Sequence, residues 1–589
     1  MDHASITSDY GAFKFWLCPY LMVVIAYDFG TTYSGAAYAF THTTPTEVFD
    51  VQNWPQKGGN FYPKVPTLSV YPRRNQQQKS TVYKQPTLLE WGYTAKKIML
   101  KPRADKENVL LSQFKLHLDE SLHRSPLENE LTPLQAVADY LAALHKHTLE
   151  EVSRGFAQNY QPDTFRYCLT VPAVWSDKAK SLMRQAAVQA GLIKPLDPPD
   201  RLILVSEPEA AALYCEETMA DQVNFKDKDR IMVCDAGGGT VDLIVFQVDF
   251  TRDAKKRELK EVTKGMGESC GSVFLDARYR ELLKSKLGTH VMNKVNPREM
   301  NTMMEYFIGT IKSEFNGVDD FFLELPRSIR VEDLPASVRK QDQEDGYLDE
   351  GILKLSNLEL KKKVFDPVVD KVISLIEQQY RKIHDKRLEY LFLVGGFGSS
   401  KYLYQSIHKV FQDTKVKHIV CPAERAALAV VRGAAYYGIN PRVVVSRISR
   451  RTYGTNVNRP FDEELDPPSK RVVKPDGVKC RNRFSVYVTK NEELPVDHCI
   501  KQEFSVAYEK GKSVTIHLYA TENDTVPRYC DDPGVYRIAT MSITIPEMPG
   551  IKNDERVYMN DRMHFGTTEI LLESGFKSGQ KCNLTCNFE

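Results

Sequence analysis

The sequence predicts an α/β protein that carries two similar strand–turn–strand units and ends in a small antiparallel β domain. Residues 24–32 and 231–240 show the same pattern, an apolar run that ends in an acid and a turn rich in Gly and Thr. Short apolar runs alternate with helical patterns as far as about residue 440, which is typical of sheets covered by helices. Beyond residue 452 the texture changes to short alternating strands separated by turn residues.

Each repeated unit is expected to place an acid beside a tight turn, Asp28 in the first unit and Asp235 in the second. Glycine lets the backbone of such a turn approach an anion closely, and the exposed N–H groups can cradle phosphate. An acid at the end of each strand can hold a metal ion through the ion's water ligands. Two such hairpins that face each other therefore predict a clamp for a nucleotide triphosphate and its Mg²⁺.

The bulk composition indicates a protein of several lobes without a general attraction to nucleic acid or membrane. The chain has 589 residues, 42% apolar and 26% charged, with a net charge of +2. Eleven cysteines are too sparse for a disulfide scaffold, so a cytoplasmic or nuclear protein is expected. The apolar run 13–25 contains Lys14 and Pro19 and merges into a strand, which argues against a signal peptide or a membrane helix.

The first half of the α/β region begins its helices with clear capping signals. Thr132 is expected to cap a helix that has Pro133 at its first position. A strand is predicted over 167–171, after which Ser176 caps a second helix that runs to about residue 191. The apolar run 202–205 predicts a further strand, which leads directly into the sequence Glu-Pro-Glu-Ala-Ala-Ala.

The second half contains longer helices and one polar insertion. Residues 300–385 predict long helices interrupted by a polar, acidic insertion near 326–352. The run 391–394 predicts a buried strand that ends in Gly-Gly-Phe-Gly, followed by a helix from about Lys401. The Ala-rich segment 426–437 predicts a closely packed helix.

The segment after this helix is basic and is expected to connect the two parts of the chain. Residues 442–451, R-V-V-V-S-R-I-S-R-R, fit either a solvated tether or a strip that docks on a lobe, and docking is favoured. Residues 460–482 are charged and contain prolines, so a mobile loop is expected there. The strands predicted for the β domain are 484–488, 504–508, 514–518, 541–545 and 568–572.

Five motifs occur in the order seen in one family of ATPases. They are D-F-G-T-T-Y-S, T-V-P-A-V-W, S-E-P-E-A-A-A, D-A-G-G-G-T-V-D and V-G-G-F-G-S-S. Together they resemble the seventy-kilodalton heat-shock chaperone family of the actin-like ATPase superfamily. The W-S-D-K-A-K segment and the long inserts resemble a divergent, lidless branch rather than the abundant housekeeping chaperones.

The resemblance implies an actin-like fold with two duplicated ribonuclease-H-like lobes, helical subdomains and a β-rich substrate-binding-like domain without a helical lid. The domains that it implies are an N-terminal extension over 1–21, lobe I over 22–220, lobe II with its inserted subdomain over 221–440, a linker over 441–452, and the β domain over 453–589.

The resemblance also assigns roles to individual residues. The residues that match nucleotide-binding positions are Gly30, Thr31, Thr32, Tyr33, Gly237, Gly238, Gly239, Thr240, Lys312, Gly395, Gly396, Phe397 and Ser399. Those that match catalytic positions are Lys115, Glu207, Asp235 and Thr240, with Lys115 positioning the attacking water. Those that match the acids around a hydrated Mg²⁺ are Asp28, Asp235 and, through water, Glu207, with Asp242 nearby. Pro172 matches the proline that relays the nucleotide state between lobes.

The chain departs from the family pattern at the adenosine end and at the linker. Phe397 and Ser399 stand where the family usually has a serine and an arginine, which removes a cation that stacks on the base. Two acids of the family are missing from the segment 271–276. The usual apolar, acidic linker is replaced by the basic run 443–451, and no helical lid is expected.

Three functions are consistent with these features. The first is an ATP-binding, slowly hydrolysing chaperone-like protein whose β domain binds an unfolded or specific client segment, with co-chaperones as further partners. The second is a nucleotide-sensing scaffold that binds ATP and ADP with little hydrolysis. The third is a phosphotransferase, because sugar kinases share the architecture, although the β domain and the spacing of the motifs argue against it.

Overall fold

The computed structural model describes most of the chain. The described residues are 23–588 except 44–45, 74–85, 155–160, 196, 220–222, 252–256, 346, 385–386, 423–425, 475–476 and 577–582. The expected N-terminal extension, residues 1–21, lies outside the described residues.

The first hairpin forms the centre of a mixed sheet with the strand order β3-β2-β1-β8-β9. The bounds are β1 Val23–Asp28, β2 Tyr33–Phe40, β3 Val48–Val51, β8 Phe165–Val171 and β9 Leu202–Ser206. β1 is antiparallel to β2 and parallel to β8, and β8 is parallel to β9. All six residues of β1 are buried, as expected for a central strand that is covered on both faces.

The second hairpin forms the centre of a seven-stranded sheet with the order β16-β15-β10-β11-β12-β17-β21. The bounds are β10 Arg230–Ala236, β11 Val241–Phe250, β12 Arg257–Glu268, β15 Leu388–Val394, β16 Val416–Val420, β17 Val444–Ile448 and β21 Glu493–Pro495. The five strands β16-β15-β10-β11-β12 have the same order and directions as β9-β8-β1-β2-β3 of the first sheet.

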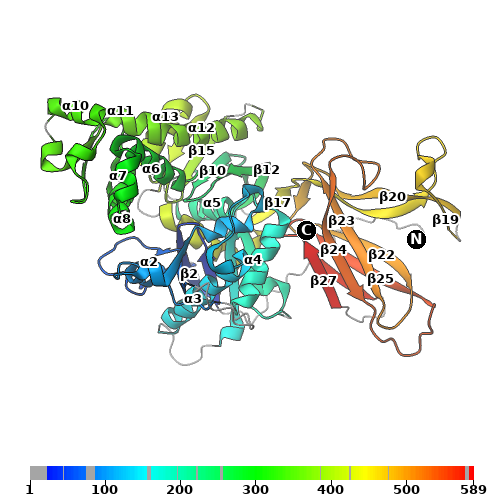
Figure 1. The fold of residues 1–589 in the computed structure, drawn as a ribbon. Helices are drawn as coiled ribbons and strands as arrows, with labels where there is room; N and C mark the ends of the chain where they lie inside the picture. The colour runs from blue at the N-terminus through cyan, green and yellow to red at the C-terminus, as the bar shows by residue number, and fades with distance from the viewer. Residues whose placement is uncertain are drawn as a thin grey trace.

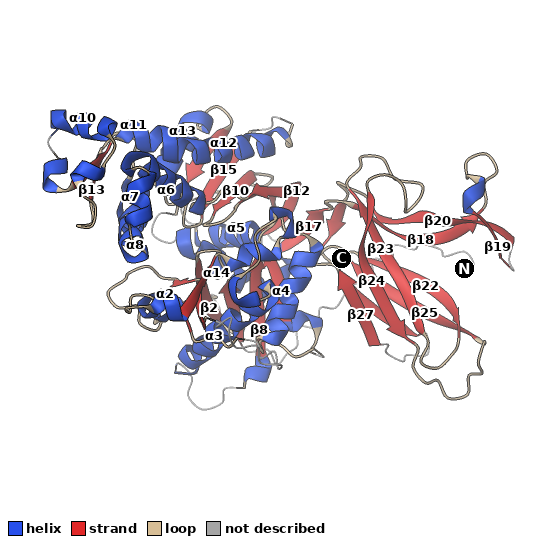
Figure 2. Ribbon diagram, viewed as in Figure 1, coloured by secondary structure: helices blue, strands red, loops and turns tan. Residues whose placement is uncertain are grey.

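Two helices, α5 (Glu207–Thr218) and α14 (Ala429–Ile439), pack between the two sheets (Figure 2). Their contact is made by small residues: a Cβ atom added to Gly433 would lie 1.7 Å from the carbonyl oxygen of Ala210. The predicted close packing of the Ala-rich helix is therefore confirmed. The outer face of the first sheet is covered by α3 (Pro133–Arg154) and α4 (Asp177–Gln189).

Helices also cover the outer face of the second sheet and extend from it as a helical subdomain (Figure 1). Their bounds are α6 Val273–Leu287, α7 Thr289–Lys294, α8 Pro297–Tyr306, α9 Lys312–Glu314, α10 Ala336–Asp345, α12 Asp366–Arg381 and α13 Lys401–Phe411. The polar insertion expected near 326–352 includes α10 and is closed by a hairpin of β13 (Phe321–Glu324) and β14 (Ile352–Leu355). Among the described residues, no helix combines the length and apolar character needed to cross a bilayer.

The predicted caps of the first-lobe helices are confirmed. The side chain of Thr132 accepts a hydrogen bond from the backbone N–H of Gln135 at 3.1 Å. The side chain of Ser176 accepts one from the backbone N–H of Ala179, also at 3.1 Å. These bonds satisfy donors that would otherwise lack partners in the first turn of each helix.

The basic segment after α14 docks on the protein as a strand. β17 pairs in parallel with β12 and antiparallel with β21, so the second sheet continues through the connecting segment. Arg447 of β17 is ion-paired with Glu209 of α5 and donates a hydrogen bond to the hydroxyl of Tyr437 at 2.9 Å. Of the two alternatives for this segment, the structure shows the docked strip, because its arginines meet buried acids rather than solvent.

The C-terminal strands form two further sheets on the side of the molecule opposite the helical subdomain (Figure 1). One has the order β19-β20-β18-β23-β24-β27 and the other β22-β25-β26. The bounds are β18 Thr452–Pro460, β19 Arg471–Lys474, β20 Gly477–Val488, β22 Cys499–Ala507, β23 Ser513–Thr521, β24 Val535–Thr544, β25 Arg556–His564, β26 Leu571–Phe576 and β27 Asn583–Phe588. Apolar residues of both sheets share one core.

The expectation of a mobile loop over 460–482 is wrong for the described residues. β19 and the start of β20 form an antiparallel hairpin there, and the segment before it is anchored by Asp466. The Asp466 carboxylate accepts hydrogen bonds from Arg528 and Tyr529 and forms an ion pair with Arg483. Charge in this segment therefore marks an internal ion-pair network rather than solvation. The strand expected at 568–572 lies three residues later, as β26.

We expect Gly433→Ala to lower the free energy of unfolding by more than about 2 kcal/mol, because the new methyl group would overlap the backbone of α5. Chemical unfolding of the purified variant measures this change. Gly309→Ala is the matched control, since a Cβ atom there meets nothing within 4 Å. Equal stability of the two variants would contradict the tight packing of α5 against α14.

Candidate functional site

The turns of the two central hairpins lie against each other. A Cβ atom on Gly238 would be 2.3 Å from Oγ1 of Thr32, and one on Gly239 would be 2.5 Å from Oγ1 of Thr31. Only glycine permits this approach, because any side chain on the second turn would collide with the threonines of the first. The structure thus brings together the two turns that the sequence singled out.

The carbonyl groups of the second turn are held by backbone hydrogen bonds from another segment of the chain. The carbonyl oxygens of Gly237, Gly238 and Gly239 each accept a hydrogen bond, at 2.9–3.1 Å, from backbone N–H groups of residues 271–273. A trans peptide holds its C=O and N–H on opposite sides. The N–H groups of Gly238, Gly239 and Thr240 therefore point away from residues 271–273, which is the arrangement of an anion-binding turn.

The first turn is held in the same way by Thr67. Its backbone N–H donates to the carbonyl of Thr32 at 2.8 Å, and its hydroxyl donates to the carbonyl of Gly30 at 2.8 Å. By the same peptide geometry, the N–H groups of Thr31 and Tyr33 point away from Thr67. Both turns therefore offer backbone donors on the side opposite their supports.

Four buried carboxylates surround the base of the two turns: Asp28, Glu207, Asp235 and Asp242. Burial, followed by the charges of the other carboxylates, raises the pKa of Asp235 well above its ordinary value. Burial raises the pKa of Glu207 to about 7, although Lys115 opposes this shift. Positive charge beside these four carboxylates is therefore strongly favourable.

Two buried lysines supply part of that charge. Nζ of Lys115 lies 2.5 Å from Oε1 of Glu207, and Nζ of Lys64 lies 2.5 Å from Oδ2 of Asp28. Lys115 is only 2% exposed, and its ammonium group lies 5.4 Å from the centre of the Trp175 ring. Burial lowers the pKa of Lys64, but Asp28 and its other neighbours outweigh this effect, so the net shift is upward.

The carboxylate cluster suits a hydrated cation better than a bare one. Within the described part of the chain, no group of three or more His, Cys, Asp or Glu residues is arranged to hold a metal ion directly. Oδ2 of Asp242 is buried and has no hydrogen-bond partner among the described residues. Magnesium usually keeps several of its waters, so carboxylates at this spacing fit an ion that they hold through water.

The loop after β15 lies against the base of the second hairpin. Gly395 has φ +85°, and a Cβ atom there would be 2.4 Å from Oδ1 of Asp235. The backbone N–H of Phe397 donates to the carbonyl of Ala236 at 2.9 Å. Gly396 and Ser399 of this loop are exposed, so they are the part of it that a ligand can reach.

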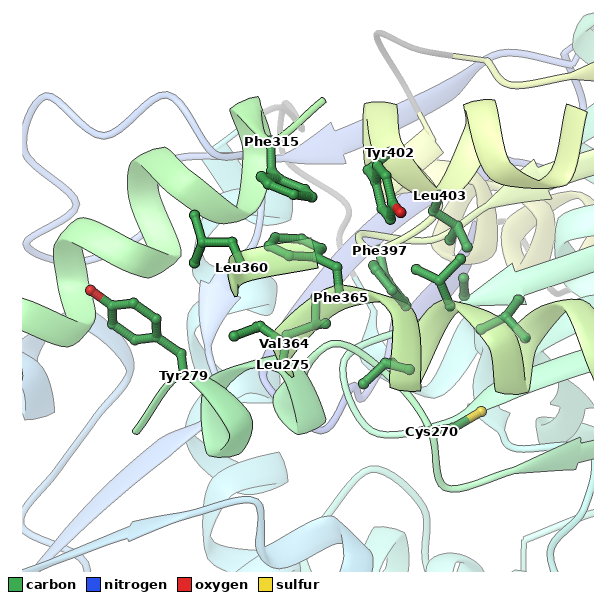
Figure 3. Packing of buried hydrophobic residues seen from close by; sticks show 14 of the residues in the cluster. Cys270, Leu275, Tyr279, Phe315, Leu360, Val364, Phe365, Phe397, Tyr402 and Leu403 are labelled. Atoms are coloured by element: carbon green, nitrogen blue, oxygen red, sulfur yellow. The ribbon is translucent and has the colours of Figure 1, made fainter. Parts of the chain in front are cut away.

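The ring of Phe397 points away from the exposed side of this loop. It packs in the core beside Phe365, Tyr402 and Leu403 (Figure 3) and is 3% exposed. The assignment of the Phe397 side chain to the nucleotide site does not fit this position. Only the backbone of Phe397 is placed to contribute to a site.

Tyr33 and Lys312 lie near the same group of acids. Burial raises the pKa of Tyr33, and nearby tyrosines and then Glu305 and Asp276 raise it further, so its hydroxyl lies close to these acids. Lys312 is ion-paired with Asp276 at 2.7 Å, and burial lowers its pKa. Lys96 of α1 (Gly92–Ile98) forms an ion pair with Glu305 at 2.6 Å, which links the first lobe directly to α8.

Comparison with known proteins identifies a matching family model and relatives of this chain. A family model described as a domain of unknown function (DUF8340) matches residues 225–420. Heat shock 70 kDa protein 12A of Homo sapiens is 26% identical over 93% of this chain and 89% of its own length. Heat shock 70 kDa protein 12B of Homo sapiens is 25% identical over 93% of this chain and 88% of its own length.

The chain is a homologue of heat shock 70 kDa proteins 12A and 12B over 93% of its length, which supports a divergent member of the heat shock 70 family. Chaperone protein dnaK of Guillardia theta is also similar, with 23% identity over 64% of this chain and 52% of its own length. This homology implies an actin-like ATPase fold and supports nucleotide binding, which agrees with the two sheets of matching order and the paired turns between them.

Sequence reasoning within the heat shock 70 framework missed three residues that contact the site: Lys64, Tyr62 and Thr67. The Tyr62 ring lies 4.7 Å from the Tyr33 ring, and a Cβ atom added to Gly396 would lie 3.3 Å from the Tyr62 hydroxyl. All three lie in the segment 62–67, which contains two prolines and belongs to none of the five motifs. The available signal was a lysine in the sequence Tyr-Pro-Lys-Val-Pro-Thr, directly before an apolar strand.

We expect Lys115→Met to destabilise the protein by about 3–5 kcal/mol, because it leaves the buried Glu207 carboxylate without its partner. The Glu207 pKa already lies above its unfolded value, and losing Lys115 raises it further. Below about pH 7 folding takes up a proton on Glu207 in the wild type as well, so the loss of stability relative to the wild type grows as pH rises above about 7. Chemical unfolding at several pH values measures the effect.

Two comparisons control this experiment. The double variant Lys115→Met/Glu207→Gln removes both charges and is expected to recover much of the loss. Lys178→Met breaks a more exposed ion pair with Glu120 and is expected to cost less than about 1 kcal/mol. A pH-independent loss for Lys115→Met would contradict an ionisable Glu207 that depends on Lys115.

Proposed function

We propose that this chain is an ATP-binding, chaperone-like protein that hydrolyses ATP slowly. The observation that carries this proposal is the pair of facing turns, each held from behind through its carbonyl groups, beside a buried cluster of acids and lysines. A polyphosphate needs backbone donors from two sides and nearby positive charge, and this arrangement supplies both.

The two turns would bind the phosphates and the loop after β15 would bind the nucleoside. The N–H groups of Thr31 and Tyr33 would donate from one side and those of Gly238 to Thr240 from the other. Gly395, Gly396 and Ser399 would meet the nucleoside, with the ion-paired Lys312 at the edge of the same cleft. Phe397 supports this loop from the core and does not stack on the base.

Hydrolysis would depend on charge and alignment more than on covalent chemistry. Lys115 is held by Glu207 at a fixed position, so its ammonium group can orient an attacking water and stabilise charge on the γ-phosphate. Glu207, with a pKa of about 7, is suited to take up a proton near neutral pH. Thr240 follows the second turn, and its side chain forms a hydrogen bond with Asp242 beside the same cluster of acids.

Asp28, Asp235 and Glu207 would hold a hydrated Mg²⁺ through its waters. When bound, the ion neutralises phosphate charge and orients the oxygens of the phosphate chain.

The fold supports a more detailed proposal for the architecture. Two sheets with the same order and directions, each with a covering set of helices, favour two duplicated ribonuclease-H-like lobes, here with boundaries close to 22–220 and 221–440. The linker 441–452 and the β domain 453–589 complete this division, although β17 belongs structurally to the second sheet.

The β domain would bind an extended segment of a client protein. Among the described strands, β22 and β26 form the edges of their three-stranded sheet, and an edge strand can pair with an added strand. Cytoplasmic residence, with the nucleus as a second site, is part of this proposal. It is supported by the eleven cysteines of the sequence, which are too sparse for a disulfide scaffold.

A second candidate is a nucleotide-sensing scaffold with little turnover, and one observation favours it. The ammonium group of Lys115 is already engaged in a buried ion pair, so it would have to leave Glu207 partly to assist a γ-phosphate. Leaving a buried carboxylate uncompensated costs several kcal/mol, by the order of magnitude known for such pairs, or about a hundredfold or more in rate.

Single-turnover hydrolysis of ATP by the purified chain distinguishes these functions. We expect ATP to bind and turn over slowly, and Lys115→Ala and Thr240→Ala each to lower the rate by about tenfold or more. Lys178→Ala, an exposed lysine on α4, serves as the control and is expected to keep the wild-type rate.

Other outcomes select other functions. ATP binding with a negligible rate that neither variant lowers would favour the scaffold. Release of ADP that depends on an added sugar would favour a phosphotransferase. Absence of nucleotide binding would exclude all three.

A further inference from the structure

Lys64 is a buried lysine that lies beside the first of the two turns. It lies directly before the short strand β4 (Val65–Pro66), which pairs with β2 beside the first turn. Its aliphatic chain runs along β2, where a Cβ atom on Gly35 would lie 3.2 Å from the Lys64 Cγ atom. Its carbonyl accepts a hydrogen bond from the hydroxyl of Tyr93 at 3.1 Å. The residue is thus fixed at both its backbone and its side chain.

The charge of Lys64 acts on the acids that end both hairpin strands. Nζ lies 2.5 Å from Oδ2 of Asp28, and Lys64 also interacts electrostatically with Asp235 of the other lobe. Oδ1 of Asp28 accepts a second hydrogen bond, from the hydroxyl of Thr170 at 3.3 Å. Both oxygens of Asp28 are therefore engaged by the protein itself.

The surroundings of Lys64 differ from those of a simple structural ion pair. Lys64 is only 8% exposed. Desolvation of an ammonium group costs free energy unless nearby negative groups offset it. The acids around it belong to both lobes and lie at the base of both phosphate-binding turns. A polyphosphate bound to these turns would bring further negative charge to the same place.

We propose that the ammonium group of Lys64 is a fixed cation of the nucleotide site, which takes over part of the charge neutralisation that a divalent ion would supply. Nucleoside di- and triphosphates then bind this chain with only weak dependence on Mg²⁺. This inference rests on the proposed nucleotide site and adds its cation requirement. A hydrated ion would then be held more weakly by Asp28 and Glu207, since Lys64 and Lys115 each already engage one of their carboxylate oxygens, and more by Asp235.

Equilibrium binding of ADP and ATP to the full chain, with excess Mg²⁺ and with EDTA, tests the inference without any measurement of turnover. We expect the wild-type Kd to rise by less than about tenfold when Mg²⁺ is removed. In Lys64→Met the same removal should raise the Kd by about a hundredfold or more, because no cation then faces Asp28. Lys64→Arg keeps the charge and should remain close to wild type.

Two further variants complete the design. Lys57→Met changes a partly exposed lysine of the same connecting segment and should show the wild-type ratio. Lys64→Met/Asp28→Asn removes the charged pair together, so it tests Lys64 even if the single variant folds poorly. It too is expected to depend on Mg²⁺ more strongly than the wild type.

The outcomes separate this inference from the proposed function. Binding by the wild type that requires Mg²⁺, or the same Mg²⁺ ratio in wild type and in both Lys64→Met variants, would overturn the role of Lys64 while the nucleotide site stands. Absence of nucleotide binding even with excess Mg²⁺ would overturn the proposed function and this inference with it.

Discussion

Four carboxylates buried at the meeting point of two sheets are the constraint on which the rest of the structure depends. Asp28, Glu207, Asp235 and Asp242 could not be buried together without compensating charge, because each raises the free energy of ionising the others. Lys64 and Lys115 each neutralise one of them at 2.5 Å. In the proposed nucleotide site, the excess of carboxylates over lysines would attract a cation, and the turns beside them would offer donors for an anion.

The two central sheets are held in register by small residues of the helices and turns between them, which makes this charge arrangement possible. Gly433 lets α14 approach α5, and Gly238 and Gly239 let the second turn reach the threonines of the first. The first turn of α5 then serves two purposes, since Glu207 points to Lys115 in the cleft and Glu209 binds Arg447 of the docked strand. One helix start therefore contacts both the candidate nucleotide site and the connection to the β region.

Much of the fold could be predicted from the sequence because its signals are local. The acid–Gly–Thr turns, the caps at Thr132 and Ser176 and the Ala-rich helix each depend on residues adjacent in the chain. Lys64 could not be predicted, because its role depends on Asp28, which is distant in sequence and adjacent only through the pairing of β2 with β4. The same limit explains the error over 460–482, where the charges of Asp466 and Arg528 pair across the fold.

Hydrogen–deuterium exchange of the full chain with and without ADP tests the central claim most directly. We expect ADP to protect the backbone amides of Thr31 and Tyr33 together with those of residues 238–240, because these N–H groups would face the same phosphates. Protection of only one turn, or protection elsewhere with both turns unchanged, would contradict a phosphate site shared by the two hairpins.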